Sequence, residues 1–227
     1  MKKFELTTNT KMFFGRKLFQ IKALVSFGDV KEGDLGGYIE KEGNLDHDGN
    51  AWVYGNARVY GNAWVYGNAR VYGDARVYGD AWVSGDVRVY GDAWVSGDAE
   101  VSGNAWVYGN ARVSGNAWVY GDARVCGDAE VSGDAEVSGN AEVSGNARVS
   151  GDADYATVKG FGREFRNTTF FRCKDGSIKV VCGCFSGTLQ EFREKVKDTH
   201  KDSKTGREYL MIADLMELHF KEKSHGE

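Results

Sequence analysis

Few side chains in this sequence have a type and spacing that would support catalysis. A histidine general base needs a reacting group within hydrogen-bond reach, and the four histidines are scattered along the chain. Only His47, at the N-terminal edge of the repeated middle, could serve, and an isolated histidine is more often structural. We therefore predict no catalytic residue. The other histidines are His200, His219 and His225.

Cysteines and aspartates supply the remaining ligand types. Cys173, Cys182, Cys184 and His200 could in principle bind zinc, but cysteines separated by eight residues and then by one match no recurrent zinc pattern. We expect these cysteines to be small, buried residues of a hairpin packed under two helices.

Aspartates at the turns are the second group of possible metal ligands. Nine of the seventeen turn residues in the repeats are aspartate, and stacked carboxylates could attract calcium. The nine-residue calcium-binding repeat is absent from this sequence, so we expect the Asn and Asp side chains to form hydrogen bonds with the backbone at the corners. No metal or cofactor is predicted.

The one array with a regular spacing is aromatic. All six tryptophans occupy position x of a six-residue repeat, Gly-Asn/Asp-Ala-x-Val-Tyr/Ser, and eight of the eleven tyrosines follow its valine. Arginines share position x, so these side chains form either a contact surface for a partner or a ladder that stabilises the chain itself. Both interpretations stay open, and contact is favoured. The candidate binding residues are Trp52, Trp64, Trp82, Trp94, Trp106, Trp118, Tyr54, Tyr60, Tyr66, Tyr72, Tyr78 and Tyr90.

The aromatic rings are confined to the first part of the repeats. From Asp122 onward, position x and the position after valine carry no ring, although the alanine and valine positions are unchanged. The core therefore gives no reason for the switch. We expect Trp82→Ala or Trp94→Ala to weaken association while barely altering the fold, and Glu130→Ala or Glu136→Ala to do neither.

The positions of all these residues depend on a strict six-residue repeat from Gly49 to Ser150. Seventeen valines mark it from Val53 to Val149. The residue two positions before each valine is alanine, except before Val89, where it is Val87. Residues two apart on an extended segment point to the same side, so alanine and valine face inward and x faces outward. Glycine, followed by Asn or Asp, supplies a bend after every strand. A bend every six residues predicts an all-β solenoid.

This pattern resembles the hexapeptide repeat of left-handed parallel β-helix proteins, in which aliphatic residues fill a triangular prism. The resemblance covers residues 49–155 and implies three hexads per turn and about six coils. The left hand is implied by the resemblance alone, because the usual crossover is right-handed. The alternative is a two-sided coil of twelve residues, which would stack four tryptophans, from Trp82 to Trp118, in one ladder. The three-sided coil instead places Trp64, Trp82 and Trp118 on one face and Trp52 and Trp106 on another.

Segments without the repeat flank the solenoid and are expected to cap it, because an open terminal coil would expose unpaired backbone. Residues 1–48 are predicted to form an N-terminal cap. It contains a β-hairpin at residues 13–23, and Leu45-Asp46-His47 takes the Ala-x-Val positions just before the regular array. The solenoid is predicted over residues 49–155, with Tyr155 in its last valine position.

Residues 156–227 are predicted to form a small α/β domain. Its hairpin would pair residues 169–173 with residues 178–185. A capping box of Thr188 and Glu191 would open one helix, and a second helix is predicted at about residues 207–220.

Both flanking segments carry resemblances of their own. Thr168–Phe171, Cys182–Phe185 and Gly187–Thr188 are similar to the C-terminal segment of hexapeptide-repeat proteins encoded by phages and prophages. Phe27–Lys31 and Gly33–Tyr38 are similar to the N-terminus of that lineage and to an uncharacterised enterobacterial family that carries an acyltransferase label. Hexapeptide-repeat acyltransferases use a histidine base between subunits and a loop thrown out of the solenoid. The seventeen hexads contain neither, so the resemblance implies a lineage and no activity.

Charge and composition indicate which partners and which cellular location to expect. Residues 1–50 sum to a net charge of 0, residues 51–154 to −7 and residues 155–227 to +3, and an acidic solenoid argues against a nucleic-acid partner. No apolar run suits a membrane helix or a secretory signal, and few, uneven cysteines suggest reduced thiols. We therefore expect a cytoplasmic protein with no membrane partner.

The function predicted from these features is non-catalytic binding or scaffolding, within a phage or prophage lineage. The Trp/Tyr ladders would be presented to a host protein, to a small planar ligand or to a second copy, and we expect a homo-oligomer, with a trimer as the first expectation. The alternatives are a hexapeptide-repeat acyltransferase that uses acyl-CoA and a virion structural part.

Overall fold

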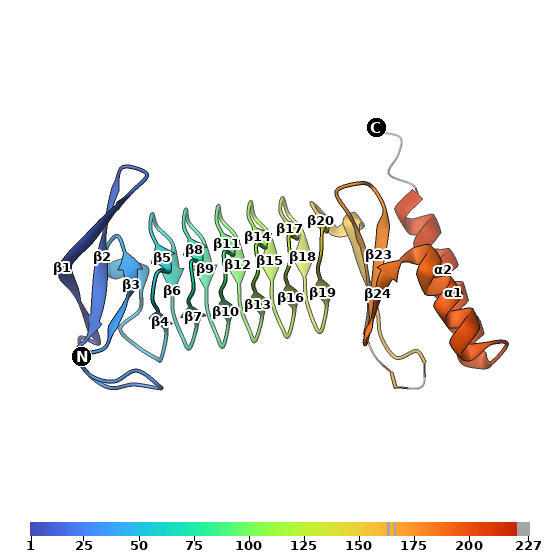
Figure 1. Ribbon diagram of the computed structural model, residues 1–227, viewed down its shortest axis with the longest axis horizontal. Helices are drawn as coiled ribbons and strands as arrows, with labels where there is room; N and C mark the ends of the chain where they lie inside the picture. Colours follow the sequence, from blue (N-terminus) through green and yellow to red (C-terminus); the bar gives the residue numbers. More distant parts are fainter. Residues whose placement is uncertain (163, 166, 222–227) are drawn as a thin grey trace.

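The computed structural model describes residues 1–162, 164–165 and 167–221. An antiparallel hairpin stands at one end of an elongated parallel β-solenoid, and a small sheet with two helices stands at the other end (Figure 1). This arrangement confirms the predicted fold class. Within the described residues, no helix is long and apolar enough to cross a membrane.

The N-terminal hairpin pairs β1 (Phe4–Phe13) with β2 (Arg16–Ala23). The chain turns at Phe14 and Gly15, both of which have positive φ. The hairpin predicted at residues 13–23 is thus shifted, because those residues hold the turn and the second strand only. The first strand was not predicted because it lacks the alternation of apolar and polar side chains that marks a half-buried strand. Phe4 is its one buried residue.

The strand β3 (Leu35–Ile39) joins the cap to the solenoid. It is antiparallel to β2 and parallel to the solenoid strand β5 (Arg58–Val59). It is followed by a short 3-10 turn, η1 (Glu42–Asn44). The buried Asn44 amide donates hydrogen bonds to the carbonyl oxygens of Gly61 and Ala63, at 3.1 and 2.8 Å.

The first coil is slightly longer than the others. In the regular array Val53 pairs with Val71. By the same spacing Leu45 would pair with Ala63, but its partner is Val65. Leu45 therefore fills a valine position, and its predicted place in an alanine position is wrong. The reason is two extra residues after Leu45, because Leu45 and Val53 are eight residues apart whereas their partners Val65 and Val71 are six apart.

Seventeen two-residue strands, β4 to β20, form the solenoid and lie on three faces. Strand partners are three hexads apart along the chain, as in the pairing of Trp82 with Glu100 and of Val83 with Val101. Each turn therefore contains three hexads, and the two-sided coil of two hexads per turn is wrong. The hand of the coil stays a prediction of the resemblance.

We name each face after its first regular strand. The β4 face contains β4 (Trp52–Val53), β7 (Arg70–Val71), β10 (Arg88–Val89), β13 (Trp106–Val107), β16 (Arg124–Val125) and β19 (Glu142–Val143). The β5 face contains β5, β8 (Arg76–Val77), β11 (Trp94–Val95), β14 (Arg112–Val113), β17 (Glu130–Val131) and β20 (Arg148–Val149). The β6 face contains β6 (Trp64–Val65), β9 (Trp82–Val83), β12 (Glu100–Val101), β15 (Trp118–Val119) and β18 (Glu136–Val137).

Burial and backbone hydrogen bonds together hold the coils. All seventeen valines are fully buried, and each contributes roughly 1.5–3 kcal/mol. Up to three backbone bonds per hexad join each coil to the next. In one hexad the N–H groups of Trp82, Ser84 and Asp86 donate to carbonyl oxygens of the following coil at 2.8–2.9 Å.

The turns require glycine for a steric reason that Gly85 illustrates. Its φ is +76°, a conformation that other residues rarely adopt. A Cβ atom there would lie 2.6 Å from the carbonyl oxygen of Gly103 in the next coil. The glycine repeat therefore permits both the bend and the close stacking of successive bends.

A four-stranded antiparallel sheet follows the last coil, in the order β21 (Tyr155–Val158), β22 (Thr168–Arg172), β23 (Ile178–Cys182) and β24 (Phe185–Thr188). A 3-10 turn, η2 (Asp152–Asp154), leads into it, so Tyr155 begins β21 and does not take a regular valine position. The predicted second hairpin strand is divided into β23 and β24 by a turn at Gly183, whose φ is +62°.

Two helices, α1 (Leu189–His200) and α2 (Lys204–Lys221), cover this sheet. Phe170 and Val180 pack with the helices, while Phe171 and Val181 extend the core of the solenoid. The sheet thus closes the open end of the last coil (Figure 1). The capping box of Thr188 at the start of α1 is present as predicted.

Candidate functional site

Arginines stack on the central tryptophans of two faces. On the β4 face, the guanidinium carbons of Arg88 and Arg124 lie 4.8 and 5.4 Å from the ring centroid of Trp106. On the β5 face, those of Arg76 and Arg112 lie 4.7 and 4.8 Å from the ring centroid of Trp94. Each ring is therefore held between two cations of its own chain, and cation–π attraction stabilises the coils.

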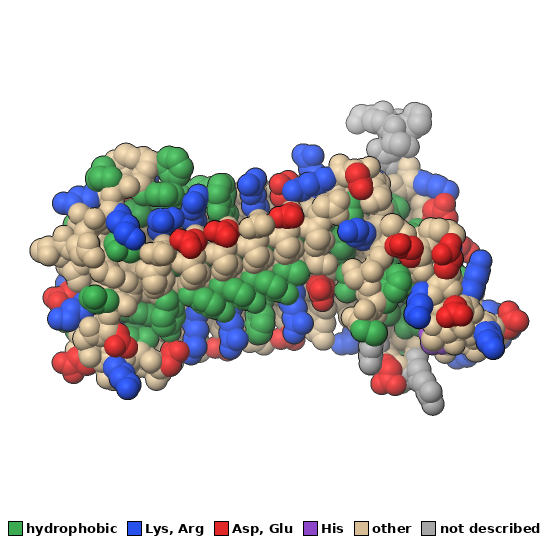
Figure 2. Space-filling view, in the orientation of Figure 1, with side chains coloured by type: hydrophobic (Ala, Val, Ile, Leu, Met, Phe, Trp, Pro, Cys, Tyr) green, Lys and Arg blue, Asp and Glu red, His purple; other side chains and the backbone are tan. Residues whose placement is uncertain are grey.

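Tyrosines form a second ladder beside the β4 face. Tyr72, Tyr90 and Tyr108 stack with parallel rings and centroids 4.8 and 5.0 Å apart, and Tyr54 meets Tyr72 edge-on. The ladder ends at Cys126, and the hydrogen bond between Tyr108 and this thiol, followed by burial, raises the pKa of Tyr108. In the view of Figure 2, a band of hydrophobic side chains runs along the lower part of the coils, with Lys and Arg side chains below it and a strip with Asp and Glu side chains above it.

The N-terminal cap covers part of the predicted aromatic surface. Trp52 is 1% exposed, with the rings of Phe4 and Phe27 against it at centroid distances of 6.2 and 5.4 Å. Its predicted place in an exposed binding surface is therefore wrong. Tyr60 is also buried, between Tyr78, stacked at 5.0 Å, and the hairpin residue Phe13.

Asp29, which lies in the cap far from the repeats, joins the site without having been a candidate from its sequence pattern. Its carboxylate accepts a hydrogen bond from the Tyr54 hydroxyl at 2.9 Å and pairs with Arg70 at 3.1 Å. Burial, followed by this hydrogen bond, raises the pKa of Tyr54 to about 12. A hollow of about 390 Å³ on the β4 face is lined by Asp29, Tyr54, Arg70, Tyr72 and Arg88. No motif in the sequence links this aspartate to the repeats.

The β6 face has a different chemistry. Its outward residues are Trp64, Trp82, Glu100, Trp118 and Glu136, with no lysine or arginine among them. Trp82 and Trp118 are 49% and 54% exposed, and the described part of the chain places no guanidinium group over either ring. A hollow of about 420 Å³ beside Trp82 is lined by three carboxylates, those of Asp80, Asp98 and Glu100. This face therefore presents rings and negative charge together.

Trp64 stands at the covered end of the β6 face. Its ring stacks on that of Tyr66 at 4.2 Å and meets Trp82 edge-on at 6.1 Å. Trp64 and Tyr66 are half-buried. The exposed aromatic part of this face is accordingly made by Trp82 and Trp118.

The Asn and Asp residues at the corners bond to one another from coil to coil. The side-chain amides of Asn104, Asn110 and Asn116 donate to the carboxylates of Asp122, Asp128 and Asp134 at 2.8–3.0 Å. We expected these side chains to bond the corner backbone, and in these pairs the partner is instead the equivalent side chain of the next coil. The reason is the exact stacking of equivalent corners in successive coils.

His47 makes structural contacts at the cap. Its ring stacks on Phe4 with centroids 4.3 Å apart, and its Nδ1 atom accepts a hydrogen bond from the backbone N–H of Lys3 at 3.1 Å. An imidazole whose nitrogen accepts this bond is occupied in holding the first strand. His225 lies outside the described residues.

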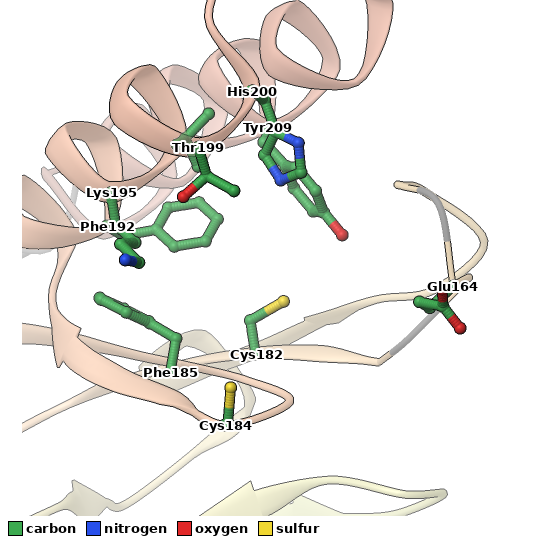
Figure 3. A pocket seen from close by; sticks show the side chains of 10 residues that line it. Glu164, Cys182, Cys184, Phe185, Phe192, Lys195, Thr199, His200 and Tyr209 are labelled. Carbon is green, nitrogen blue, oxygen red and sulfur yellow. The ribbon is translucent and has the colours of Figure 1, made fainter.

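The C-terminal domain separates the four residues whose types would suit zinc. Cys173 is buried against the solenoid core, whereas Cys182, Cys184 and His200 line a pocket of about 280 Å³ under the helices (Figure 3). Cys184 is exposed, so the expectation of buried cysteines is wrong for this residue, which lies in the turn between β23 and β24. Within the described residues, no group of three or more His, Cys, Asp or Glu side chains could hold a metal ion.

The fold and its faces define a capped β-solenoid repeat protein. Four segments of the solenoid, residues 51–67, 69–85, 81–97 and 105–121, match the family model described as the YdcK beta solenoid repeat. The match lies wholly within the hexads, so it shows what the solenoid is similar to and does not extend to the two caps. No curated protein matches the chain.

Proposed function

We propose that this chain is a non-catalytic binding or scaffold protein whose contact surface is the β6 face. The observation that carries the proposal is the difference between the tryptophans. Trp94 and Trp106 lie between arginines of their own chain, whereas Trp82 and Trp118 are about half exposed. Large exposed rings gathered on one face are typical of protein contact surfaces.

The acyltransferase alternative is disfavoured by the surroundings of His47. A general base must accept a proton from its substrate, and the Nδ1 atom of His47 already accepts a backbone hydrogen bond. We expect no saturable binding of acetyl-CoA in isothermal titration calorimetry. Saturable binding that is lost in His47→Ala would favour the enzyme instead.

Site-specific photo-crosslinking in the source cells tests the contact surface. A benzophenone amino acid at position 100, on the β6 face, should yield a covalent adduct with a protein partner. The matched control places the same group at position 148, an exposed residue of the β5 face, and should yield much less. Equal adducts from the two positions, or none from position 100, would contradict the proposal.

A phage or prophage lineage is the narrower part of the proposal. It is supported by the terminal segments Thr168–Phe171 and Phe27–Lys31, which resemble proteins of that lineage. Phage genes on both sides of the coding sequence are the expected result of inspecting the genome. A neighbourhood of housekeeping genes would contradict this part and leave the contact surface unaffected.

A further inference from the structure

The outward residues of two faces follow complementary orders along the solenoid. On the β6 face, successive coils present Trp64, Trp82, Glu100, Trp118 and Glu136. On the β4 face, the next strand of each same coil presents Arg70, Arg88, Trp106, Arg124 and Glu142. In the first four coils, arginine thus corresponds to each tryptophan of the β6 face, and tryptophan corresponds to its glutamate.

This correspondence matters because coils stack at a constant spacing of ~4.8 Å. If a second copy lies parallel and level with the first, Trp82 meets Arg88 and Trp118 meets Arg124 of that copy. Glu100 then meets Trp106 and lies between the two arginines. Like charges meet only in the fifth coil, where Glu136 and Glu142 mark the end of the complementary stretch.

The hollows and exposed side chains of the two faces agree with this pairing. The β6 face carries the exposed Trp82 beside a hollow of about 420 Å³ lined by carboxylates. The β4 face carries the exposed Arg88 beside a hollow of about 390 Å³ that Tyr72 also lines. Each face therefore offers a side chain at the level of the hollow on the other, and a carboxylate-lined hollow suits a guanidinium group.

We infer that copies of this chain associate by placing the β6 face of one against the β4 face of the next, parallel and in register. The inference rests on the proposed function and names the partner. Within one chain, Arg88 already stacks on Trp106, and the same chemistry joins Arg88 of one copy to Trp82 of another. Because the two faces differ, the contact is heterologous, and it produces a ring or a filament.

Two other self-contacts fit the residues less well. An antiparallel pairing of two β6 faces about Glu100 would place this carboxylate against its own copy. The second is a contact of the β6 face with the β5 face, whose outward residues follow the same order as those of the β4 face. There, however, the ring of Phe13 covers Arg58 and Arg76 at 4.6 and 5.1 Å. Lys174 from the C-terminal domain also pairs with Glu130, at 2.9 Å. Less of the β5 face is therefore open to a second copy.

Variants with one disabled face each provide the test. Trp82→Ala with Glu100→Arg disables the β6 face, and Arg88→Glu with Arg124→Glu disables the β4 face. In analytical ultracentrifugation at micromolar concentration, the wild-type chain should associate, and each double variant alone should need at least tenfold higher concentration to do so. An equimolar mixture of the two should form a one-to-one dimer and nothing larger, because each copy keeps one competent face.

Several results would overturn the inference. If the variant with the disabled β4 face forms dimers alone, the contact is isologous. If the wild-type chain stays monomeric while position 100 still crosslinks to another protein, self-association fails and the contact surface survives. Circular dichroism verifies folding, and Arg124→Glu alone, which leaves Arg88 on Trp106, replaces the double variant if that variant unfolds. Arg148→Glu on the β5 face is the matched control and should associate like wild type.

Discussion

Replacing Trp106 with alanine measures how much the arginine sandwiches stabilise the solenoid. Two exposed cation–π contacts, from Arg88 at 4.8 Å and Arg124 at 5.4 Å, contribute about 0.5–1 kcal/mol each. The edge contact with Tyr90 at 6.4 Å adds roughly 0.5 kcal/mol. Trp106→Ala should therefore lower the free energy of unfolding by about 1.5–2.5 kcal/mol, before any loss of buried surface.

Trp118→Ala is the matched comparison. Trp118 is 54% exposed, and within the described residues no guanidinium group stacks on it, so its removal should cost only about 0.5 kcal/mol. Urea denaturation followed by far-ultraviolet circular dichroism, at a concentration where the chain is monomeric, measures both. A double-mutant cycle of Arg88→Ala and Trp106→Ala should give a coupling energy of about 0.5–1 kcal/mol. A coupling near zero, or equal losses for the two tryptophans, would refute the sandwich argument.

Three further changes test the turns, the tyrosine ladder and the cysteines. Gly85→Ala should lower the free energy of unfolding by at least ~2 kcal/mol, because positive φ and the contact with the Gly103 carbonyl both oppose a Cβ atom. Gly176 has a φ of +80° and no atom within 4 Å of an added Cβ, so Gly176→Ala should lower it by only ~1 kcal/mol. The same urea assay measures both. Because burial and the Asp29 hydrogen bond raise the pKa of Tyr54 to about 12, its contribution to stability is complete below the ordinary tyrosine pKa of ~10 and is lost as pH rises through 12. Tyr54→Phe should flatten that alkaline decline in urea midpoints, and an unchanged decline would contradict the assignment. Alkylation of the native protein, followed by mass spectrometry, should modify the exposed Cys184 first, since Cys126 and Cys173 are buried and burial raises the pKa of both thiols; earlier modification of Cys173 would show that the C-terminal sheet does not cover the last coil.

The interior of the solenoid was predictable because it depends on a local pattern. Alanine and valine two residues apart must share a side of any extended strand, so their burial does not depend on the number of faces. The number of faces was not determined by the period, because a coil of two hexads and a coil of three both preserve it. The pairing of Trp82 with Glu100 settles it. The valine position of Leu45 was not recognised either, because two extra residues between Leu45 and Val53 break the six-residue spacing before the regular array begins.

The binding surface was predicted as one array and is divided by the structure. Trp82 and Trp94 look equivalent in the sequence, with the same neighbours at positions −1 and +1. Their environments differ because side chains of the adjacent coils surround each ring. Arg76 and Arg112 flank Trp94, whereas Trp64 and Glu100 pair beside Trp82. Trp94 therefore belongs with the stabilising ladder, and our expectation that its removal would mainly weaken association passes to Trp82 and Trp118.

The near-identity of the coils has a consequence for how the chain finds its native pairing. If one coil were looped out, the alanines and valines of the remaining coils would still meet, so the core scarcely distinguishes neighbours from next-nearest neighbours. Side chains on the outside do distinguish them. A slip of one coil would bring Arg76 beside Arg112 and leave Trp94 outside the stack, and Asn104 would meet Asn140 in place of Asp122. In this solenoid the surface, more than the core, encodes the order in which coils assemble.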